Sequence, residues 1–372
     1  MIKKIIFVGN TSWSMIKFRK GLLKKLVKLG FEVTVVSPFD DYCEEIISLG
    51  CKYQKIMIDN KGSNPLKDIR LIIDLKKIYE QIKPDLIIHY TIKPNIYGTI
   101  AAKLSHIKSF AVVTGLGFTF INDTFVSKIA KLLYKFSFQF SDKVFFINKD
   151  DRKEFIDGKL ITANKTFLIP SEGISIELFY PESTVKNTEE FRFLLIARML
   201  WDKGVGEYVE AAKVLKRKDL KVEFGLLGYL DVANPKAISK EQMNSWVNDG
   251  FVKFYGSTDN VKSFISKSDC IVLPSYREGI SMTLMESASM EKPLIATNVP
   301  GCKDVVDDGI NGFLCEVKNA QDLADKMEMM LKLTSEERRA MGKAGREKMI
   351  REFDEKIVID KYLEAIESVL KK

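Results

Sequence analysis

The chain has 372 residues, of which 46% are hydrophobic and 29% are charged. This length exceeds one typical hydrophobic core and predicts two domains, and the composition is typical of a soluble globular protein. No apolar run approaches the ~20 residues that cross a bilayer, which argues against a membrane-spanning helix. The apolar stretch after Met1 is also too short for the hydrophobic region of a signal peptide, so we expect no export.

Charge and cysteine content narrow the range of partners and compartments. Residues 1–182 carry 28 Lys and Arg against 19 Asp and Glu, whereas residues 183–372 carry 30 against 31. The basic first half predicts an anionic partner, such as a membrane surface or a diphosphate lipid. A lysine-rich solvated surface is the equal alternative. The five cysteines form no Cys-x-x-Cys pair, which is typical of reduced, mostly buried thiols in the cytoplasm.

The first half alternates short apolar runs with segments of helical periodicity. This alternation predicts a mostly parallel, doubly wound α/β sheet. Helices are expected at 18–29 and 65–81. The expected strands are 5–8, 33–37, 53–58, 86–89, 110–113, 144–147 and 167–169.

Two loops of the first half carry candidate binding groups. Gly9 and Asn10 follow the first expected strand and precede a helix, so they would approach a ligand from the first domain, with an ordinary loop as the equal alternative. No Gly-x-Gly-x-x-Gly pattern accompanies them. His89 ends its strand and could contact a bound sugar or acceptor, but a structural histidine is at least as reasonable.

The segment 125–140 is rich in aromatic residues and carries three lysines on one side of an expected helix, namely Lys128, Lys131 and Lys135. A basic amphipathic helix suits contact with a membrane interface. A core-packed helix with one solvated face is the alternative. Together with the basic first half, the pattern favours a cytoplasmic protein that is peripheral to the inner face of the cytoplasmic membrane.

The strand–helix pattern restarts after a polar, proline-bearing segment at 179–184, which predicts a linker. Segment 357–370 has apolar residues at helical spacing and predicts a C-terminal helix. The strands expected in the second half are 193–197, 222–227, 252–255, 270–273 and 294–297. They predict a second doubly wound domain.

Arg198 and Lys203 follow the strand that begins the second domain. Ligands of open α/β sheets bind at the carboxyl ends of strands. Arginine supplies a rigid fork of donors and lysine a compact charge, so the pair suits a diphosphate. A surface ion pair of Lys203 with Asp202 or Glu207 is the alternative.

Glu278 and Glu286 flank a turn between a buried strand and a helix. Gly279, Ile280 and Ser281 lie in this turn, where backbone N–H groups at a helix start would add phosphate contacts. Carboxylates beside an anion site suit hydroxyl groups instead, which predicts acceptors for a ribose and a sugar. Two solvated carboxylates at a helix start are the alternative.

The chain contains no Asp-x-Asp triplet and no Cys/His cluster with the spacing of metal ligands. Protein cations are therefore expected to hold the diphosphate in place of a metal ion. We expect neither a metal nor any other cofactor, and no nucleic-acid partner.

The Arg198/Lys203 pair and the Glu278-x7-Glu286 motif resemble those of the retaining GT-B glycosyltransferases of family 4, over essentially the whole chain. The resemblance implies two Rossmann-like domains facing a cleft. They would be an acceptor-binding domain at 1–180 and a nucleotide-sugar-binding domain at 190–355, with a C-terminal helix at 356–372 packing back on the first domain.

The resemblance also implies roles for single residues. Arg198, Lys203 and Glu278 would be catalytic: the two cations would stabilise the leaving diphosphate, and Glu278 would face the transferred sugar. Glu286 would bind the ribose. The remaining donor-binding positions would be Gly9, Asn10, Gly228, Gly279, Ile280, Ser281 and Leu284.

The segments 93–98 and 113–118 resemble a subgroup that acts on polyprenyl-diphosphate-linked sugars. Lys93, Thr114 and Gly115, together with His89, would then lie on the acceptor side. The subgroup implies transfer of N-acetylgalactosamine or another N-acetylhexosamine from a UDP-sugar, in the assembly of a bacterial surface glycan or glycoprotein. Retention would proceed by departure and attack on one face of the sugar.

Three other functions remain open. A GT-B transferase could act on a soluble acceptor, although the aromatic-basic segment and the 114–118 loop disfavour this. An inverting or epimerase-type enzyme would need a carboxylate or histidine base for which there is no clear candidate. A non-catalytic nucleotide-sugar-binding protein is disfavoured by the complete set of Arg198, Lys203, Glu278 and Glu286.

Overall fold

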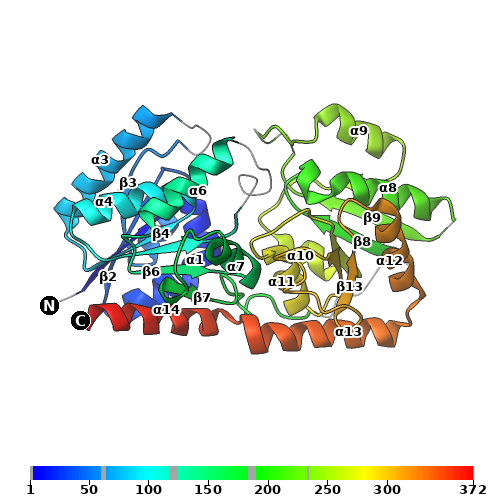
Figure 1. The fold of residues 1–372 in the computed structure, drawn as a ribbon. Helices are drawn as coiled ribbons and strands as arrows, with labels where there is room; N and C mark the ends of the chain where they lie inside the picture. Colours follow the sequence, from blue (N-terminus) through cyan, green and yellow to red (C-terminus); the bar gives the residue numbers. More distant parts are fainter. Residues whose placement is uncertain are drawn as a thin grey trace. The chain divides into compact units, whose positions relative to one another are not determined.

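The structure is a computed structural model that describes residues 3–59, 64–116, 125–182, 190–218, 220–230, 232 and 234–371. The chain divides into two compact units (Figure 1). Unit 1 comprises Met1–Gly173 together with Glu355–Lys372, and unit 2 comprises Ile174–Asp354. Within the described ranges, no helix is both long enough and apolar enough to cross a membrane.

Unit 1 is built on a seven-stranded parallel sheet in the order β3-β2-β1-β4-β5-β6-β7. The central strands are apolar runs buried on both faces, as in parallel sheets covered by helices. The strands are β1 (Lys4–Val8), β2 (Glu32–Ser37), β3 (Lys52–Lys55), β4 (Leu86–Tyr90), β5 (Ser109–Val113), β6 (Lys143–Phe146) and β7 (Thr166–Leu168).

The helices of unit 1 cover both faces of this sheet, with α3, α4 and α6 on one face and α1 and α14 on the other (Figure 1). Asn64 starts α3 by accepting a hydrogen bond from the N–H of Leu66 at 3.0 Å. The helices are α1 (Ser12–Lys28), α2 (Cys43–Ser48), α3 (Pro65–Ile82), the π-helical turn η1 (Pro94–Gly98), α4 (Thr99–Leu104), α6 (Phe125–Ser137), α7 (Lys149–Asp157), the short turn η2 (Ala163–Lys165) and α14 (Glu355–Leu370).

The C-terminal helix α14 is an integral part of unit 1. The ring of Tyr362 stacks on that of Phe145 in β6, with centroids 5.1 Å apart. Lys3 and Lys108 donate hydrogen bonds to the carbonyl oxygens of Leu370 and Val369, at 2.8 and 2.6 Å. These cations satisfy carbonyl groups that the helix end leaves open, and they complement its negative dipole end.

Unit 2 is built on a six-stranded parallel sheet in the order β10-β9-β8-β11-β12-β13. Its strands are β8 (Phe191–Ile196), β9 (Val222–Leu227), β10 (Lys253–Phe254), β11 (Cys270–Leu273), β12 (Leu294–Thr297) and β13 (Gly312–Cys315). Its helices are η3 (Trp201–Lys203), α8 (Val205–Lys216), α9 (Lys240–Asn248), α10 (Val261–Ser266), α11 (Met282–Ser289), α12 (Ala320–Lys332), α13 (Ser335–Lys348) and η4 (Met349–Phe353).

Each sheet has one point at which the strand order reverses. In unit 1 the chain runs outward from β1 in one direction and resumes at β4 on the other side, and in unit 2 the same happens between β8 and β11. Loops that leave the carboxyl ends of the two strands at such a point diverge and leave a crevice for ligands. The topology thus selects the loops after β1, β4, β8 and β11 as candidate binding loops.

The predicted strands are present, but two features differ from the sequence analysis. Strand β13 was not predicted, because Gly312–Cys315 is short and follows a polar turn. The chain enters unit 2 at Ile174, earlier than the predicted linker at 179–184. The N–H of Ile174 donates to the carbonyl of Phe353 at 2.9 Å, and the hydroxyl of Ser289 donates to the carbonyl of Phe179 at 2.6 Å. Residues 183–184 of the predicted linker lie outside the described residues.

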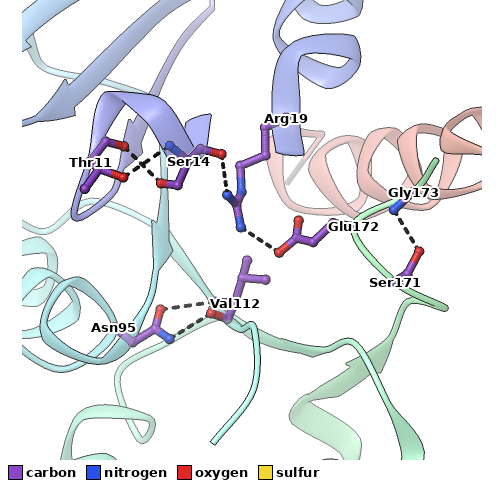
Figure 2. A network of polar contacts seen from close by, with 8 residues as sticks. All are labelled: Thr11, Ser14, Arg19, Asn95, Val112, Ser171, Glu172 and Gly173. Atoms are coloured by element: carbon purple, nitrogen blue, oxygen red, sulfur yellow. Dashed lines mark hydrogen bonds and ion pairs between the residues drawn. The ribbon is translucent and has the colours of Figure 1, made fainter. Parts of the chain in front are cut away.

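A buried ion pair joins α1 to the last segment of unit 1 before the chain leaves it. The guanidinium of Arg19 donates to the carboxylate of Glu172 at 2.6 Å and to the carbonyl of Ser14 at 2.9 Å (Figure 2). The guanidinium also lies 3.9 Å from the ring centroid of Tyr90. Burial raises the pKa of Glu172, and the charge of Arg19 opposes this shift. The two side chains are 4% and 6% exposed, so neither charge has access to bulk water.

We predict that Arg19→Leu destabilises unit 1 by about 3–5 kcal/mol, because the mutation leaves Glu172 buried without its charged partner. Lys20→Leu is the matched control, since Lys20 also forms a 2.6 Å ion pair from α1, with Glu45, but these side chains are 45% and 35% exposed. Loss of such a surface pair costs only ~0–1 kcal/mol. Urea unfolding measures both variants, and equal shifts of the midpoint would contradict the role of the buried pair.

Candidate functional site

The loops that follow β8 and β11 meet at the switch point of unit 2. Lys203 ends the turn η3, and Glu278 lies five residues beyond β11. The ammonium nitrogen of Lys203 lies 2.5 Å from the carboxylate oxygen Oε1 of Glu278. The side chains are 20% and 14% exposed, so the pair is partly shielded but reachable. Two residues that are 75 positions apart in the chain are therefore neighbours at the predicted place.

The structure gives Lys203 a partner that was not predicted, and its role at a diphosphate stays a prediction. The alternative ion pair with Asp202 or Glu207 is not the one that forms, because Glu278 takes the lysine and Glu207 accepts a hydrogen bond from the hydroxyl of Tyr276 at 2.6 Å. Lys203 also does not stand alone as a phosphate-binding cation, since Glu278 partly neutralises it. An incoming anion would have to draw the ammonium group away from this carboxylate.

Backbone contacts hold the two loops together beneath this pair. The N–H of Tyr276 donates to the carbonyl of Asp202 at 2.9 Å, and the hydroxyl of Ser275 lies 3.3 Å from the same oxygen. Gly204 follows Lys203 with φ of +71°, and a Cβ atom there would lie 2.0 Å from the carbonyl oxygen of Pro274. Only glycine therefore allows the loop after β8 to lie against the end of β11.

A third loop, after β12, supports Glu278 and was missed in the sequence analysis. The N–H of Glu278 donates to the carbonyl of Pro300, and the N–H of Ser281 donates to the carbonyl of Gly301, both at 3.1 Å. Gly301 has φ of +79°, and a Cβ atom there would lie 2.6 Å from the Glu278 carbonyl. The Pro-Gly dipeptide after a buried strand was the available signal, since it marks a turn.

Helix α11 begins as predicted, but not every predicted contact in it is available. Ser281 caps the helix by accepting a hydrogen bond from the N–H of Leu284 at 3.3 Å. Because the N–H of Ser281 already donates to Gly301, it does not point to a phosphate, which corrects its predicted role. The side chain of Leu284 is fully buried and serves the core, so its predicted donor contact is also wrong for the side chain. Glu286, Gly279 and Ile280 remain candidate donor contacts.

Arg198 and Gly228 lie at the carboxyl ends of the neighbouring strands β8 and β9. Arg198 is exposed, as a diphosphate ligand must be. Gly228 has no room for a side chain, since a Cβ atom would lie 1.7 Å from the carbonyl oxygen of Ala197. Its N–H donates to the carbonyl of Gly256 at 2.7 Å, so Gly228 shapes the rim of the sheet and does not offer its N–H to a ligand.

The charges of Glu278 and Lys203 also influence the pKa of the buried thiol of Cys302. Burial raises its pKa well above the usual value, the negative charge of Glu278 adds to the rise and Lys203 opposes it. Cys302 therefore stays a neutral thiol and is no candidate nucleophile. The candidate site of unit 2 therefore consists of two cations, Arg198 and Lys203, and two carboxylates, Glu278 and Glu286. Such a set can bind an anion and hydroxyl groups and can stabilise growing negative charge.

In unit 1, the structure corrects the predicted role of His89. The side chain is fully buried in β4, and its Nε2 atom lies 3.0 Å from the hydroxyl of Tyr79. Burial lowers its pKa to about 3, so the ring is neutral at physiological pH. His89 is thus a structural residue under the loop, and it does not reach an acceptor.

The other acceptor-side candidates remain close to the surface. Lys93 forms an ion pair with Asp68 of α3 at 2.6 Å, and the hydroxyl of Tyr97 donates to the other oxygen of Asp68 at 2.8 Å. Thr114 and Gly115 follow β5 and are half-buried. Gly117 and Phe118, the last residues of the motif at 113–118, lie outside the described residues.

Gly9 and Asn10 follow β1, one of the two strands at the switch point of unit 1. The N–H of Gly9 donates to the carbonyl of Val36 at 3.1 Å, and Thr11 starts helix α1 by accepting from the N–H of Ser14 at 3.1 Å. Asn10 therefore lies where strand gives way to helix, as predicted. In the part of the chain that the structure describes, no group of three or more His, Cys, Asp or Glu residues could hold a metal ion.

Two doubly wound α/β units, one with charged loops at its switch point, define a class of fold that binds ligands at the carboxyl ends of its strands. Residues 177–348 match the family model for group 1 glycosyl transferases, and residues 4–148 match the model described as glycosyl transferase 4-like. The chain belongs to the glycosyltransferases of this group 1, family 4-like type. The predicted family resemblance and the predicted GT-B fold class are thereby confirmed.

Relatives and solved structures agree with this assignment. An N,N'-diacetylbacillosaminyl-diphospho-undecaprenol alpha-1,3-N-acetylgalactosaminyltransferase of Campylobacter jejuni is 29% identical, over 99% of each chain. A UDP-Gal:alpha-D-GlcNAc-diphosphoundecaprenol alpha-1,3-galactosyltransferase of Escherichia coli is 26% identical, over 68% of each chain. The crystal structure of a glycosyltransferase from Rickettsia africae has a TM-score of 0.79 at 19% identity, and the match covers 100% of this chain and 99% of that one.

We predict that acidification destabilises the protein through His89. The unfolded chain takes up the imidazole proton near pH 6.5, whereas the folded chain does not until about pH 3, so stability falls as pH drops below 6.5. Between pH 7 and pH 5 the loss should reach about 2 kcal/mol. His89→Gln should remove this part of the pH dependence, and His106→Gln, at the exposed second histidine, should keep it. Urea unfolding at the two pH values distinguishes them, and parallel curves for wild type and His89→Gln would refute the assignment.

Proposed function

We propose that this glycosyltransferase is a retaining enzyme that moves a sugar from a UDP-sugar to a polyprenyl-diphosphate-linked saccharide. The sugar would be N-acetylgalactosamine or another N-acetylhexosamine, and the product would enter a bacterial surface glycan or glycoprotein. The observation that carries the proposal is the Lys203–Glu278 pair at the switch point of unit 2. The Campylobacter and Escherichia relatives, whose names specify undecaprenyl-diphosphate-linked acceptors, support the choice of acceptor.

The donor would bind by an exchange of partners at this pair. The diphosphate would draw the ammonium group of Lys203 away from Glu278, while exposed Arg198 supplies a bidentate fork from the same loop as Lys203. Glu278 would then be able to accept hydrogen bonds from hydroxyl groups of the transferred sugar. Glu286, half-buried in the second turn of α11, would accept those of the ribose. Unit 2 would thus be the donor domain, and unit 1 the acceptor domain.

Transfer would form and break bonds on one face of the sugar. The bond between the anomeric carbon and the UDP oxygen breaks, and the acceptor hydroxyl oxygen forms the new bond from the same side. The hydroxyl proton passes to the departing diphosphate oxygen, so UDP itself serves as the base. The protein contributes positioning and charge: Arg198 and Lys203 stabilise the negative charge that grows on the diphosphate.

A screen of UDP-sugars tests the function directly. UDP release is measured with a polyprenyl-diphosphate-linked saccharide and, separately, with the same saccharide free in solution. Release that needs the lipid-linked acceptor supports the proposal, and the anomeric configuration of the product decides between retention and inversion. Equal rates with the free saccharide would favour the soluble-acceptor alternative, and no release with any donor would favour a binding protein.

We predict that Arg198→Ala and Lys203→Ala each lower turnover by ~10²–10³, because each removes one contact that stabilises the leaving diphosphate. Arg217→Ala is the control, since Arg217 is an exposed arginine of unit 2 outside the switch point. Circular dichroism and melting temperature establish that the variants are folded. Near-normal turnover of the double variant would show that these cations do not hold the diphosphate.

We further propose that unit 1 binds an anionic membrane surface, where the lipid-linked acceptor lies. Helix α6 exposes a stripe of large apolar side chains, and its Lys128 and Lys135 are exposed beside it. Helix α3 exposes a second apolar stripe, and both helices pack against η1 on the same face of the sheet (Figure 1). The exposed apolar residues are Leu66, Ile69 and Ile73 on α3, and Phe125, Val126, Ile129, Leu132 and Phe136 on α6. Apolar stripes flanked by lysines are typical of interfacial helices.

We predict that replacing Lys128, Lys131 and Lys135 with Glu weakens binding to anionic vesicles by roughly a hundredfold or more, because each lysine near an anionic surface contributes ~1 kcal/mol. The control replaces Lys24, Lys25 and Lys28 of α1, which are exposed and belong to the helix on the other face of the sheet. Vesicle sedimentation at low salt measures both triple variants. Equal losses would point to net charge alone, and no binding by wild type would refute the membrane contact.

A further inference from the structure

A pocket of about 470 Å³ lies in unit 2 outside the proposed donor site. Its walls come from the loop before α8 and from α8, α9 and the start of α12, and none of Arg198, Lys203, Glu278 or Glu286 lines it. The volume is within the ~300–1,000 Å³ that is typical of small-molecule sites. The side chains that give it chemical character are Trp201, Glu207, Gln242, Trp246 and Lys318.

Two indole rings form an apolar corner of this pocket. The rings of Trp201 and Trp246 meet edge to face, with centroids 5.8 Å apart and planes at 81°. Trp246 is nearly buried, whereas Trp201 is 38% exposed and offers a ring to solvent. Gly206 lies beneath Trp201 so closely that a Cβ atom would be 2.7 Å from the ring, and the indole can therefore lie flat on α8. Trp201 therefore presents a fixed, partly exposed aromatic face to the pocket, on which an apolar ring face could stack.

The strongest observation is a carboxylate oxygen that lacks a hydrogen-bond donor. Glu207 accepts from the hydroxyl of Tyr276 through Oε1 at 2.6 Å, but its Oε2 atom is buried and receives no hydrogen bond from the described residues. Burial and the carboxylate of Glu207 raise the pKa of Tyr276, so this phenol remains a donor. A buried acceptor without a donor is costly, so a bound group that supplied a donor to this carboxylate would stabilise it.

Hydrogen-bond donors also line the pocket. Lys318, in a left-handed conformation with φ of +60°, places its ammonium group 5.0 Å from the ring centroid of Tyr276. Gln242 adds a carboxamide from the first turn of α9. The pocket thus offers an aromatic face, a negatively charged acceptor and two donor groups. Sugars match this set, because their C–H faces are apolar and each ring hydroxyl can both donate and accept.

We propose that this pocket is an accessory saccharide site that binds a neutral hexose or N-acetylhexosamine ring. The ring stacks on Trp201, one hydroxyl donates to the carboxylate of Glu207, and others accept from Lys318 and Gln242. Glu207 and Glu210 line the pocket together with Lys213 and Lys318, so the lining carries no net charge, which suits a neutral sugar better than a phosphate or a nucleotide. The site does not depend on the transfer reaction, and it adds a second carbohydrate contact to the donor-binding unit.

The test is calorimetry on the full chain with the methyl glycosides of glucose, galactose, N-acetylglucosamine and N-acetylgalactosamine and with disaccharides of these sugars. Titrations are done with and without saturating UDP. We expect saturable binding of at least one of these sugars, with the same affinity in both conditions. No saturable binding at the solubility limit of any of them would overturn the proposal, and binding that UDP abolishes would assign the sugar to the donor site.

Variants locate the sugar. Glu207→Gln keeps the shape and an acceptor for Tyr276 but loses the charge, and it should weaken sugar binding by roughly ten- to a hundredfold. Trp201→Ala should abolish it through loss of the stacking face, and Glu347→Gln, an exposed carboxylate on α13, should leave it unchanged. Melting temperatures confirm folding. Wild-type affinity in Glu207→Gln would refute the site, and transferase assays that fail while sugars still bind would separate it from the proposed reaction.

Discussion

The Lys203–Glu278 contact is the interaction on which the candidate site depends. It joins the two loops that diverge from the switch point of unit 2, and the hydrogen bonds from Tyr276 and from Glu278 to neighbouring loops hold it in place. A pair exposed to 20% and 14% lies between two extremes. A fully exposed pair would contribute little, and a fully buried one would exchange partners only at high cost. Partial burial gives a pair that is ordered without ligand and still open to an anion.

Unit 1 contains an ion pair that is shielded from solvent and has a structural role. Arg19 and Glu172 are buried, and the guanidinium also donates to the carbonyl of Ser14 (Figure 2). The ring of Tyr90 lies against the same guanidinium. No ligand could replace Glu172 without leaving a buried charge, so this pair is structural. The same two charge types thus serve different purposes in the two units, and the difference lies in solvent access. Sequence alone does not reveal this, because both pairs join residues far apart in the chain.

The parts of the fold that could be predicted from the sequence are those set by local pattern. Buried parallel strands are apolar runs, so β8 and β11 and the loops after them were placed correctly. The errors lie where a contact between distant segments decides a group's role. His89 is buried against Tyr79, the N–H of Ser281 is taken by Gly301, and Leu284 belongs to the core. Each of these groups was predicted to contact a ligand, because its actual partner lies in a different loop or helix and is not evident from the sequence.

The pocket beside α8 could not be predicted from the sequence either. Trp201, Glu207, Gln242 and Lys318 follow no spacing that a motif could capture, since they come from two turns and from the first turns of two helices. Trp201 lies two residues before Lys203, and Tyr276, which holds Glu207, lies two residues before Glu278. The loop after β8 therefore contributes to both the charged pair and the pocket, and the loop after β11 holds Glu207, which lines the pocket. The proposed donor and the proposed sugar would therefore contact different side chains of the same two loops, and binding of one would leave the contacts of the other in place.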